Sequence, residues 1–424
     1  MSSSSQSKIF EEVTCPFCSL LCDDLVLRNR DGKLTVKRNG CAKAVRGFET
    51  ADSDVPPHIH GKQTSLDEAV THAAEILRDA RQPIITGLGT DVSGSRAAML
   101  LAESSGAILD HSHADGAINN ALALQSGGWV MTTLAELKNR ADVIVFIGTD
   151  GNSNFPRLFE RFIWNQYSCS GLKKNNREII YLGHNLKTRP GLNPGAGKAT
   201  VIHCTDESLG ETVAVLRALV KGCEIKSDSI TGRKLGALKR VSERIKQASY
   251  GVFIWAPGEL LQPHAELTIQ TICELLKELN QMSRCAGLAL GGDNGGTSFV
   301  NVCTWQSGYP SRISYTEGYP EYDPYNFSEK AVLGKTEADA LLWISSFDKG
   351  LQPPQTNIPA IMLTRPSKKI ALDAEVYIPI ATPGLDHVGN LFRTDNVVCL
   401  PLKKIRQTGR HSVSDILTRI HQSL

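Results

Sequence analysis

Short apolar runs alternate with amphipathic stretches along most of the chain after Cys41. The runs are rich in β-branched residues, end in Gly, Ser or Asn, and have the length of strands that are buried on both faces of a sheet. The amphipathic stretches have helical patterns. This alternation predicts an α/β protein in which helices cross over between parallel strands. The expected strands lie at 83–89, 142–150, 178–183, 250–255, 339–346 and 359–364, and the expected helices at 66–80, 93–105, 207–221 and 267–279.

Glycine-rich loops follow several of the expected strands. Ligands of parallel α/β sheets gather at the carboxyl ends of the strands, and glycine lets a bulky cofactor approach the backbone. None of these loops carries a GxGxxG or a Walker A motif, so a simple nicotinamide site or P-loop has little support. The loops are 87–90, 148–152, 183–185 and 256–258.

The composition is that of an ordinary globular protein. Of the 424 residues, 41% are hydrophobic, 21% charged and 6% aromatic. The chain has 46 Lys and Arg against 44 Asp and Glu, a formal net charge of +2. So small a charge gives no strong field toward nucleic acid or acidic membranes, and we expect neither as a partner. The length exceeds that of one hydrophobic core, which predicts two or three domains.

The start of the chain and its apolar runs bear on where the protein works. The first eight residues are polar and no apolar segment follows them, so we expect no secretory signal. The longest apolar runs, such as 143–147, are far shorter than a membrane-spanning helix. We therefore expect a soluble, cytoplasmic protein. Because thiols stay reduced in the cytoplasm, clustered cysteines there indicate a metal or a redox cofactor rather than disulfides.

Four of the eleven cysteines form the sharpest motif of the chain, C-x2-C-x3-C-x18-C. Two cysteines three residues apart in a tight turn can reach one metal centre, and the third lies one turn further on. A hairpin over 25–36, with Asp31-Gly32 as its turn, would bring back the fourth. The spacing therefore predicts one metal site with four thiolates. The four cysteines are Cys15, Cys18, Cys22 and Cys41.

Four thiolates suit a [4Fe–4S] cluster or a tetrahedral zinc ion. The x3 spacing disfavours a zinc ribbon, which usually pairs two CxxC units, so we favour the cluster. A zinc site and a site that has lost its metal remain as alternatives. Lys43 follows Cys41 by two residues, where a cation would tune the cluster or bridge it to a second cofactor, unless it is simply solvated. The other seven cysteines are scattered singly, and we expect them to be small buried hydrophobic residues.

A cysteine motif of this kind followed by α/β domains resembles the molybdopterin and tungstopterin oxidoreductases. Over nearly its whole length the chain resembles the B subunit of formylmethanofuran dehydrogenase, and it looks most like the branch found in bacterial formyltransferase/hydrolase complexes. Several motifs in the same order carry this resemblance. They lie at 15–25, 133–142, 304–310, 378–384 and 392–395.

The resemblance implies a role in tetrahydromethanopterin-linked one-carbon metabolism. Catalytic members of the family reduce carbon dioxide to formate at a tungsten or molybdenum bis-pterin centre, with electrons arriving through the cluster, and other subunits attach the formyl group to methanofuran. In the bacterial branch, formyl groups leave tetrahydromethanopterin and are released as formate, and the B-like subunit is structural. The implied partners are the A and C subunits and the formyltransferase of such a complex.

One departure from the catalytic pattern concerns the ligand of the pterin-bound metal. Catalytic members need a Cys or selenocysteine there, but the corresponding region of this chain, 110–116, offers only Ser112, beside His113. No cysteine lies between Cys41 and Cys169. Because a hydroxyl is a poor substitute for the soft thiolate, we expect a degenerate site near Ser112 and His113, without molybdopterin or tungstopterin.

A second departure lies in the glycine-rich stretch 291–297. Catalytic members carry Arg and His where this chain has Gly291 and Asp293. Losing a cation and an imidazole would remove groups for carboxyl binding and proton transfer. These departures favour an interaction subunit of a formyltransferase/hydrolase complex over a working oxidoreductase that interconverts CO2 and formylmethanofuran. A free-standing zinc or iron–sulfur module is the third hypothesis.

The expected fold is a molybdopterin-oxidoreductase-like α/β architecture with an N-terminal cysteine hairpin module and two doubly wound α/β domains. We expect the cysteine module at residues 1–55 and a discontinuous domain at 56–135 and 291–424. An inserted Rossmann-like domain occupies 136–290. The resemblance, rather than composition, implies this insertion. It also implies that the C-terminal β-barrel of pterin enzymes is absent from this chain.

Overall fold

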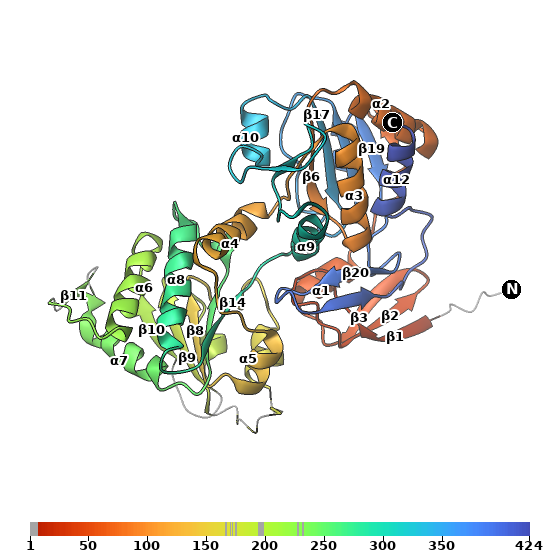
Figure 1. Ribbon diagram of the computed structural model, residues 1–424. Helices are drawn as coiled ribbons and strands as arrows, with labels where there is room; N and C mark the ends of the chain where they lie inside the picture. Colours follow the sequence, from red (N-terminus) through yellow and green to blue (C-terminus); the bar gives the residue numbers. More distant parts are fainter. Residues whose placement is uncertain are drawn as a thin grey trace. The chain divides into compact units, whose positions relative to one another are not determined.

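The computed structural model divides into two compact units, described here one at a time (Figure 1). Unit 1 comprises Met1–Ala114 with Gly292–Leu424, and unit 2 is Asp115–Gly291. The first junction thus lies at 114/115, whereas the sequence placed it near 135. The structure describes residues 7–165, 168–169, 171, 173, 176–193, 199–226, 229–230 and 233–424, so the polar start at 1–6 lies outside the described residues.

A nine-stranded sheet forms the centre of unit 1, in the order β16-β15-β7-β6-β17-β18-β19-β4-β5. Its middle strands, β7 to β19 in that order, are parallel, and antiparallel pairs extend both edges. From β6 the chain continues to β7 on one side, and the later strand β17 pairs with β6 on its other side. The switch point of the sheet therefore lies between β6 and β17. The strands are β4 (His58–Ile59), β5 (Lys62–Gln63), β6 (Pro83–Gly89), β7 (Ile108–Leu109), β15 (Ile313–Ser314), β16 (Glu321–Tyr322), β17 (Ala340–Ser345), β18 (Ala360–Thr364) and β19 (Val376–Pro379).

Helices bury both faces of this sheet. One face packs α2, α3, α9 and α12 around side chains such as Ile85, Phe299 and Leu342, and the other packs α10 around Trp343 and Tyr377. The fully buried pattern of β6, β17 and β18 confirms the predicted continuous apolar strands. The helices of unit 1 are α1 (Ala42–Glu49), α2 (Leu66–Asp79), α3 (Val92–Ser105), α9 (Gly296–Ser307), α10 (Glu329–Gly334), α11 (Lys368–Asp373) and α12 (Val413–Gln422).

The N-terminal cysteines belong to a small antiparallel sheet in unit 1, of order β1-β2-β3. The predicted hairpin is confirmed, since Arg30 pairs with Lys33 and the intervening Asp31 and Gly32 have φ of 52° and 83°. A separate two-stranded ribbon, β20-β21, lies in the C-terminal part of the chain. The strands are β1 (Ser7–Val13), β2 (Leu25–Arg30), β3 (Lys33–Arg38), β20 (Gly389–Phe392) and β21 (Cys399–Leu402).

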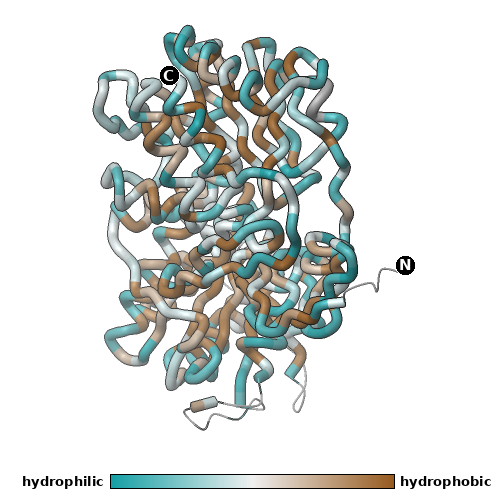
Figure 2. Tube along the Cα trace, turned by 90° about the vertical axis from the view of Figure 1, so that its right-hand side faces the viewer, coloured by the Kyte–Doolittle hydropathy of each residue, from teal (hydrophilic) through white to brown (hydrophobic). Residues whose placement is uncertain are grey.

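Unit 2 is built on a fully parallel five-stranded sheet of order β10-β9-β8-β13-β14. Its switch point lies between β8 and β13. The strands of unit 2 carry buried hydrophobic residues such as Val145 and Phe253. In Figure 2 the outer loops of the trace are largely hydrophilic. The elements are α4 (Ala114–Gly127), α5 (Leu134–Arg140), β8 (Val143–Ile147), η1 (Phe159–Ile163), β9 (Glu178–Gly183), η3 (Arg189–Gly191), β10 (Thr200–His203), α6 (Asp206–Val220), β11 (Ser229–Ile230), β12 (Arg233–Lys234), α7 (Leu235–Lys246), β13 (Gly251–Trp255), η4 (Pro257–Glu259), α8 (Ala265–Leu279) and β14 (Cys285–Ala289).

No helix among the described residues is long and apolar enough to cross a membrane. The seven cysteines outside the N-terminal motif divide into two groups. Four of them are buried, as predicted, but three are exposed, because they lie on loops or on the short ribbon β20-β21 rather than in the core. The buried ones are Cys204, Cys273, Cys285 and Cys303, and the exposed ones are Cys169, Cys223 and Cys399.

Asp52, just after α1, is the centre of a buried ion cluster in unit 1. Its side chain is 3% exposed and its oxygens contact four cationic groups. Burial alone would raise the pKa of this carboxyl, but Arg365, Lys349 and Arg406 hold it well below its usual range. The contacts are Lys349 Nζ at 2.7 Å, Arg365 Nε at 2.8 Å, Arg406 Nη2 at 2.5 Å and Arg410 Nη1 at 3.1 Å.

Arg365 connects this cluster to the cysteine segment. It directly follows β18, and its side chain is only 2% exposed. Besides contacting Asp52, its guanidinium donates to the carbonyl oxygens of Gly47 at 2.9 Å and Thr50 at 3.2 Å. A cation at the C-terminal end of a helix satisfies carbonyls that have no partner within the helix. One side chain therefore fixes the end of α1 against the carboxyl end of β18.

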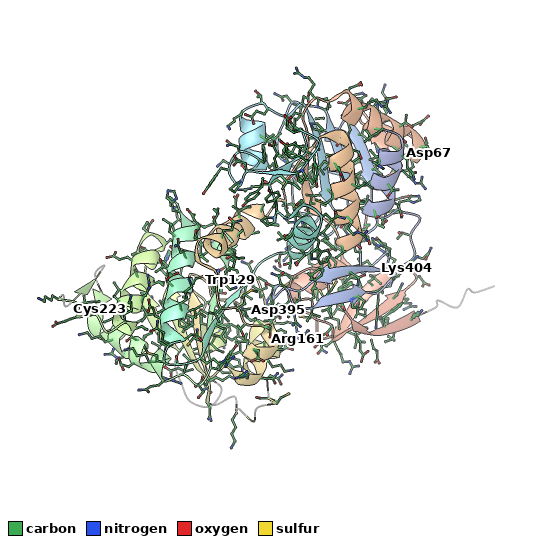
Figure 3. The ribbon with its side chains drawn as sticks, in the orientation of Figure 1. Asp67, Trp129, Arg161, Cys223, Asp395 and Lys404 are labelled. Carbon is green, nitrogen blue, oxygen red and sulfur yellow. The ribbon has the colours of Figure 1, made fainter. Side chains whose placement is uncertain are left out.

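We expect Asp52→Asn to destabilise the protein strongly. The amide keeps the shape of the carboxylate but removes the charge that four cations share, and breaking a buried ion pair by removing one partner costs about 3–5 kcal/mol. Urea unfolding of the full chain measures this loss. Asp67→Asn is the matched control, because Asp67 is 92% exposed, lies at the outer surface (Figure 3) and pairs with Arg419 at 3.5 Å. That control should shift stability by less than about 0.5 kcal/mol. A loss below about 1 kcal/mol in Asp52→Asn would contradict the central role of the cluster.

Candidate functional site

The structure brings the four motif cysteines to one end of the small β1-β2-β3 sheet. Cys15, Cys18 and Cys22 lie in the loop between β1 and β2 and are buried, while Cys41 is half-buried and immediately precedes α1. The loop folds back on itself, since the N–H of Cys15 donates to the carbonyl of Cys22 at 2.9 Å and the N–H of Leu21 donates to the carbonyl of Cys18 at 3.0 Å. The hairpin returns the chain to Cys41, as the sequence predicted.

Lys43 lies among these cysteines, and its ammonium contacts the Asp293 carboxylate at 2.8 Å. The two side chains are 23% and 30% exposed. Burial would lower the pKa of Lys43, but its pKa is raised, because Asp293 pairs with it and the sulfurs of Cys18 and Cys41 lie near enough to favour its charge. Lys43 is therefore a charged member of the cysteine site.

The thiol of Cys18 is buried beside the Lys43–Asp293 pair. Burial raises the pKa of Cys18 well above its usual value, and the Asp293 carboxylate raises it further, whereas Lys43 lowers it. A buried thiol of this kind stays protonated unless a metal displaces the proton, because the thiolate is the form that binds metals. The site thus has the donor set of a metal centre.

Asp293 connects the cysteine loop with the glycine-rich loop before α9. Its Oδ1 accepts a hydrogen bond from the backbone N–H of Ser19 at 2.9 Å, in addition to the contact of its Oδ2 with Lys43. Where the resemblance places a histidine in catalytic members, this chain therefore uses a carboxylate to hold the cysteine loop and its lysine. Sequence analysis identified Asp293 only as a departure, because nothing in the local sequence shows that Ser19 and Lys43 are its neighbours.

His111 occupies the buried centre of the loop that follows β7. Burial, and after it the neighbouring His113, lowers the pKa of His111 to about 3. Its Nδ1 accepts a hydrogen bond from the His113 backbone N–H at 3.0 Å, so the proton is on Nε2, which lies 3.2 Å from the carbonyl oxygen of Asn294. The ring also stacks on Phe299 at 5.7 Å between centroids. His111 is thus a neutral side chain whose two ring nitrogens are both engaged.

Ser112 and His113, where the sequence predicts a degenerate site, lie on the same loop but differ in exposure. Ser112 is half-buried, and its hydroxyl donates to the carbonyl oxygen of Gly87 at 3.2 Å, at the end of β6. His113 is exposed. The loop places Ser112 at the switch-point edge of the nine-stranded sheet, while its neighbour faces solvent.

The glycine-rich loop packs closely against the end of β6. Gly295 has φ of 78°, and a Cβ there would lie 2.2 Å from the carbonyl oxygen of Thr90, so the close approach requires glycine. The amide of the neighbouring Asn294 is buried against Gly89, and neither its oxygen nor its nitrogen has a hydrogen-bond partner among the described residues. The loop therefore leaves one amide unsatisfied at the edge where ligands of such sheets bind.

Two buried charged groups of unit 1 have no signal in the local sequence. The Asp52 cluster brings together residues from four separate stretches of the chain. The carboxyl of Asp110, which precedes His111, lies 3.4 Å from Arg312 Nε. Burial raises the pKa of Asp110 to about 6, although Arg312 lowers it. An isolated Asp in a polar loop carries no sequence signal of burial, so only the tertiary structure could reveal either group.

We expect His111 to make the protein less stable as the pH falls from 6.5 toward 3. The unfolded chain binds a proton at this histidine near pH 6.5 and the folded chain does not, so acid favours unfolding. Between pH 6.5 and 5 the free energy of unfolding of the native chain should fall by roughly 1–2 kcal/mol more than that of His111→Gln. Chemical unfolding at several pH values measures the difference. Asp110, whose pKa shifts in the opposite direction, is present in both proteins, so its effect cancels in the comparison. Parallel pH profiles of the two proteins would contradict the assignment of His111 as a neutral side chain.

Comparison with known proteins gives sequence relatives in two kinds of complex. The B subunit of the tungsten-containing formylmethanofuran dehydrogenase 2 of Methanocaldococcus jannaschii is 28% identical, with 94% of each chain covered. The B subunit of the formyltransferase/hydrolase complex Fhc of Methylorubrum extorquens is also 28% identical, over 86% of this chain and 97% of the relative. No family model matches the chain.

Solved structures agree with these relatives. A chain of the formyltransferase/hydrolase complex FhcABCD from Methylorubrum extorquens, crystallised with methylofuran, superposes with a TM-score of 0.72 at 27% identity, over 86% of this chain and 98% of that one. Acetylene hydratase from Pelobacter acetylenicus has a TM-score of 0.62 at 12% identity, over 98% of this chain and 70% of that one, a likeness of fold alone. The resemblance predicted from the sequence motifs is therefore confirmed: the chain is similar, over most of its length, to the B subunit of formylmethanofuran dehydrogenase and to its counterpart in the bacterial formyltransferase/hydrolase complex.

Proposed function

We propose that the chain is the B subunit of a formyltransferase/hydrolase-type complex, with a structural role in the tetrahydromethanopterin-linked conversion of formaldehyde to formate. The observation that carries this proposal is the state of Ser112, which stands where the resemblance places the metal-binding cysteine of catalytic members. Its hydroxyl is already engaged with the backbone of Gly87. A protein that binds no reactive metal at this position can still support the assembly of its partners.

The surrounding donor groups do not fit a pterin-bound tungsten or molybdenum ion. Such a metal takes a soft thiolate, and the loop 110–116 contains none. His111 is neutral and both of its ring nitrogens are engaged, so it is poorly placed to transfer protons. Asp293 is paired with Lys43 and Ser19. The groups that remain near the switch point therefore serve packing and loop connection, which supports the structural role.

The four-cysteine site does fit a [4Fe–4S] cluster. Cys15, Cys18, Cys22 and Cys41 would hold it, and such a cluster supplies one-electron transfer when it is bound. Lys43 adds a positive charge beside the thiolates, which offsets their repulsion. The x3 spacing between Cys18 and Cys22 supports the cluster over a zinc ribbon, which usually pairs two CxxC units.

A working oxidoreductase is the alternative function. The complete set of four cysteines and the charged Lys43 favour it, because a protein without electron transfer has no need of a cluster. The unsatisfied amide of Asn294 at the edge of the sheet is the second observation in its favour, since a bound ligand would supply its missing partner. This alternative requires that the metal be held without a thiolate from the chain.

Exposed aromatic side chains support membership in a complex. Trp305, Tyr319 and Tyr325, all in the stretch from α9 to α10, are 59%, 58% and 65% exposed. Tyr and Trp are enriched in protein interfaces, and exposed aromatic side chains gathered in one stretch of a chain often mark such surfaces. We propose that this stretch contacts other members of the complex, among which the resemblance names the A and C subunits and the formyltransferase.

Metal analysis of the purified complex tests the structural role directly. We expect iron but less than about one tenth of an equivalent of tungsten or molybdenum per chain, even from cells supplied with both metals, because the thiolate ligand is missing. The same preparation should show no formate-dependent dye reduction. Stoichiometric tungsten or molybdenum, together with dye reduction, would instead establish the oxidoreductase.

Replacing one motif cysteine tests the cluster. We expect Cys18→Ser to remove most of the iron and the visible absorbance of the anaerobically purified protein, because a hydroxyl replaces one of four thiolate ligands. Cys399→Ser is the matched control, since Cys399 is an exposed cysteine on β21 and should leave both signals unchanged. If the zinc content, rather than the iron content, decreases in Cys18→Ser and not in Cys399→Ser, the four cysteines bind zinc. If neither metal is present in the native protein, the cysteines form a site without metal.

A further inference from the structure

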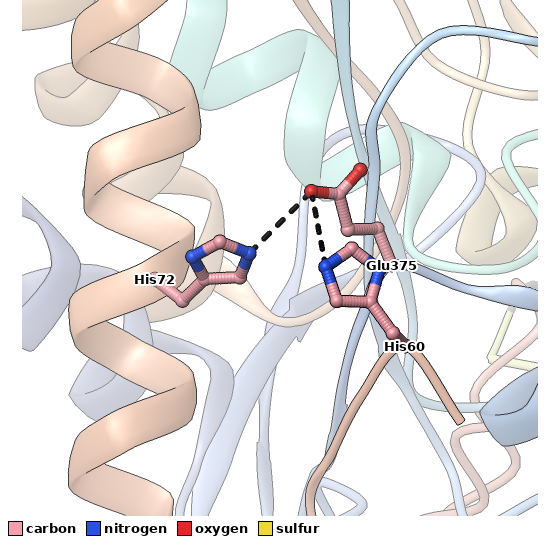
Figure 4. Close-up of side chains that lie close together, drawn as sticks. All are labelled: His60, His72 and Glu375. Atoms are coloured by element: carbon pink, nitrogen blue, oxygen red, sulfur yellow. Dashed lines mark ion pairs between the residues drawn. The ribbon is translucent and has the colours of Figure 1, made fainter. Parts of the chain in front are cut away.

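A second cluster of metal-binding side chains lies at the edge of the nine-stranded sheet, apart from the cysteines. His60, His72 and Glu375 come together from three elements (Figure 4). His60 is in the turn of the β4-β5 hairpin, His72 is on α2, and Glu375 directly precedes β19. Their ligand atoms all lie within 4.8 Å of one another. We propose that these three residues form a binding site for a divalent cation of the zinc class.

The distances within this His60–His72–Glu375 site suit such an ion. One oxygen, Oε1 of Glu375, lies 3.4 Å from Nε2 of His72 and 3.9 Å from Nε2 of His60. Zinc binds imidazole nitrogen and carboxylate oxygen at about 2.0–2.2 Å, so ligand atoms in a tetrahedral site are about 3.4 Å apart. The His72–Glu375 pair already has this separation. The His60–Glu375 pair needs a shift of about half an ångström, which the exposed His60 side chain can make.

The contacts of His72 direct its second ring nitrogen toward Glu375, where an ion between the two would bind. Nδ1 of His72 lies 3.1 Å from Oε2 of Glu75, which can only accept, so Nδ1 carries a proton. Nε2 is buried and makes no hydrogen bond to any described residue. In the neutral ring, Nε2 therefore presents a lone pair to the carboxylate oxygen of Glu375. Two acceptors that face each other at 3.4 Å repel, and a cation between them would remove the repulsion.

Glu75 completes an arrangement that is common around metal-binding histidines. A carboxylate that accepts from the second ring nitrogen fixes the tautomer and the direction of the ligating nitrogen. Glu75 and His72 are three residues apart on α2, so the helix itself sets their geometry. The helix begins with a capping box formed by Ser65 and Glu68, which fixes where its first turn starts.

The backbone holds the other two ligands in place. The N–H of His60 donates to the carbonyl oxygen of Glu375 at 2.7 Å, and the neighbouring pair Ile59 and Val376 is in register between β4 and β19. His60 and Gly61 form the tight turn, with φ of 48° and 72°. Glu375 and His60 therefore approach each other before any ion binds, which lowers the cost of forming the site.

The donor set and exposure decide the class of ion. Two imidazole nitrogens and one carboxylate are the ligands of zinc sites with three protein residues, in which water takes the fourth position. Magnesium and calcium prefer oxygen ligands, so they fit this site poorly. The His60 side chain is 65% exposed, whereas those of His72 and Glu375 are 29% and 25% exposed, so the ion can enter from solvent.

Titration of the full-length chain with Zn2+, after treatment with a chelator, tests the proposal. Because the cysteine motif can also take up Zn2+, the measured quantity is the difference between the native chain and variants that all keep the four cysteines. We expect His72→Ala and Glu375→Gln each to bind one equivalent less than the native chain. Glu75→Gln should keep the equivalent, with an affinity reduced about 10- to 100-fold.

His264→Ala is the matched control. His264 pairs with Glu266 at 3.1 Å and its side chain is 76% exposed, but this pair has no second histidine, so the variant should bind like the native chain. His60→Ala distinguishes loss of a ligand from loss of folding. It removes an exposed side chain that the fold does not need, and this variant should also bind one equivalent of Zn2+ less than the native chain.

Co2+ in place of Zn2+ gives a second readout. Because the four cysteines can also bind Co2+, the readout is again a difference spectrum. The native chain minus His72→Ala, or minus His60→Ala, should show a visible absorption band without sulfur-to-metal charge transfer. Equal stoichiometry and affinity in the native chain, His60→Ala and Glu375→Gln would overturn the proposal and leave the three residues as an ion-paired surface cluster.

Discussion

The carboxylate of Asp52 is the interaction on which the arrangement of unit 1 depends. It is almost fully buried, and it is surrounded by cations from the segment after β17, the end of β18 and the stretch before α12. A charge removed from water in this way is tolerated only when partners compensate it, and Asp386 neutralises part of the remaining excess through Arg406. Because Asp52 directly follows α1, the cysteine segment cannot move away from the sheet without exposing unpaired charges.

A second connection to the cysteine segment runs through Asp293. Asp52 and Arg365 fix the C-terminal end of α1. Asp293, in contrast, contacts Lys43 in the first turn of α1 and accepts a hydrogen bond from Ser19 in the cysteine loop. Both connections join residues that lie hundreds of positions apart. The cysteine site is therefore a product of the whole of unit 1, since its hairpin alone supplies neither anchor.

The sequence predicted the elements whose signal is local. Strands such as β6 and β17, the hairpin and the grouping of the cysteines follow from periodicity and spacing. It did not predict β14, where small residues give a weak apolar run and Gly287 is needed because a Cβ would lie 2.7 Å from the ring of Trp255. The partner of Lys43, the burial of His111 and the meeting of the proposed cation ligands depend on tertiary contacts. A lone histidine or aspartate has the same local signal whether it is solvated or buried.

The insertion of unit 2 between Ala114 and Gly292 sets the order in which the chain can fold. Unit 2 is continuous, so all strands of its parallel sheet are available as soon as β14 has been synthesised. Unit 1 has to wait, because β6 at Pro83 pairs with β17 at Ala340 and the Arg365 that anchors α1 comes later still. During synthesis the cysteine segment, although made first, is therefore among the last parts to reach its native environment, and its thiols stay accessible to solvent until the C-terminal strands arrive.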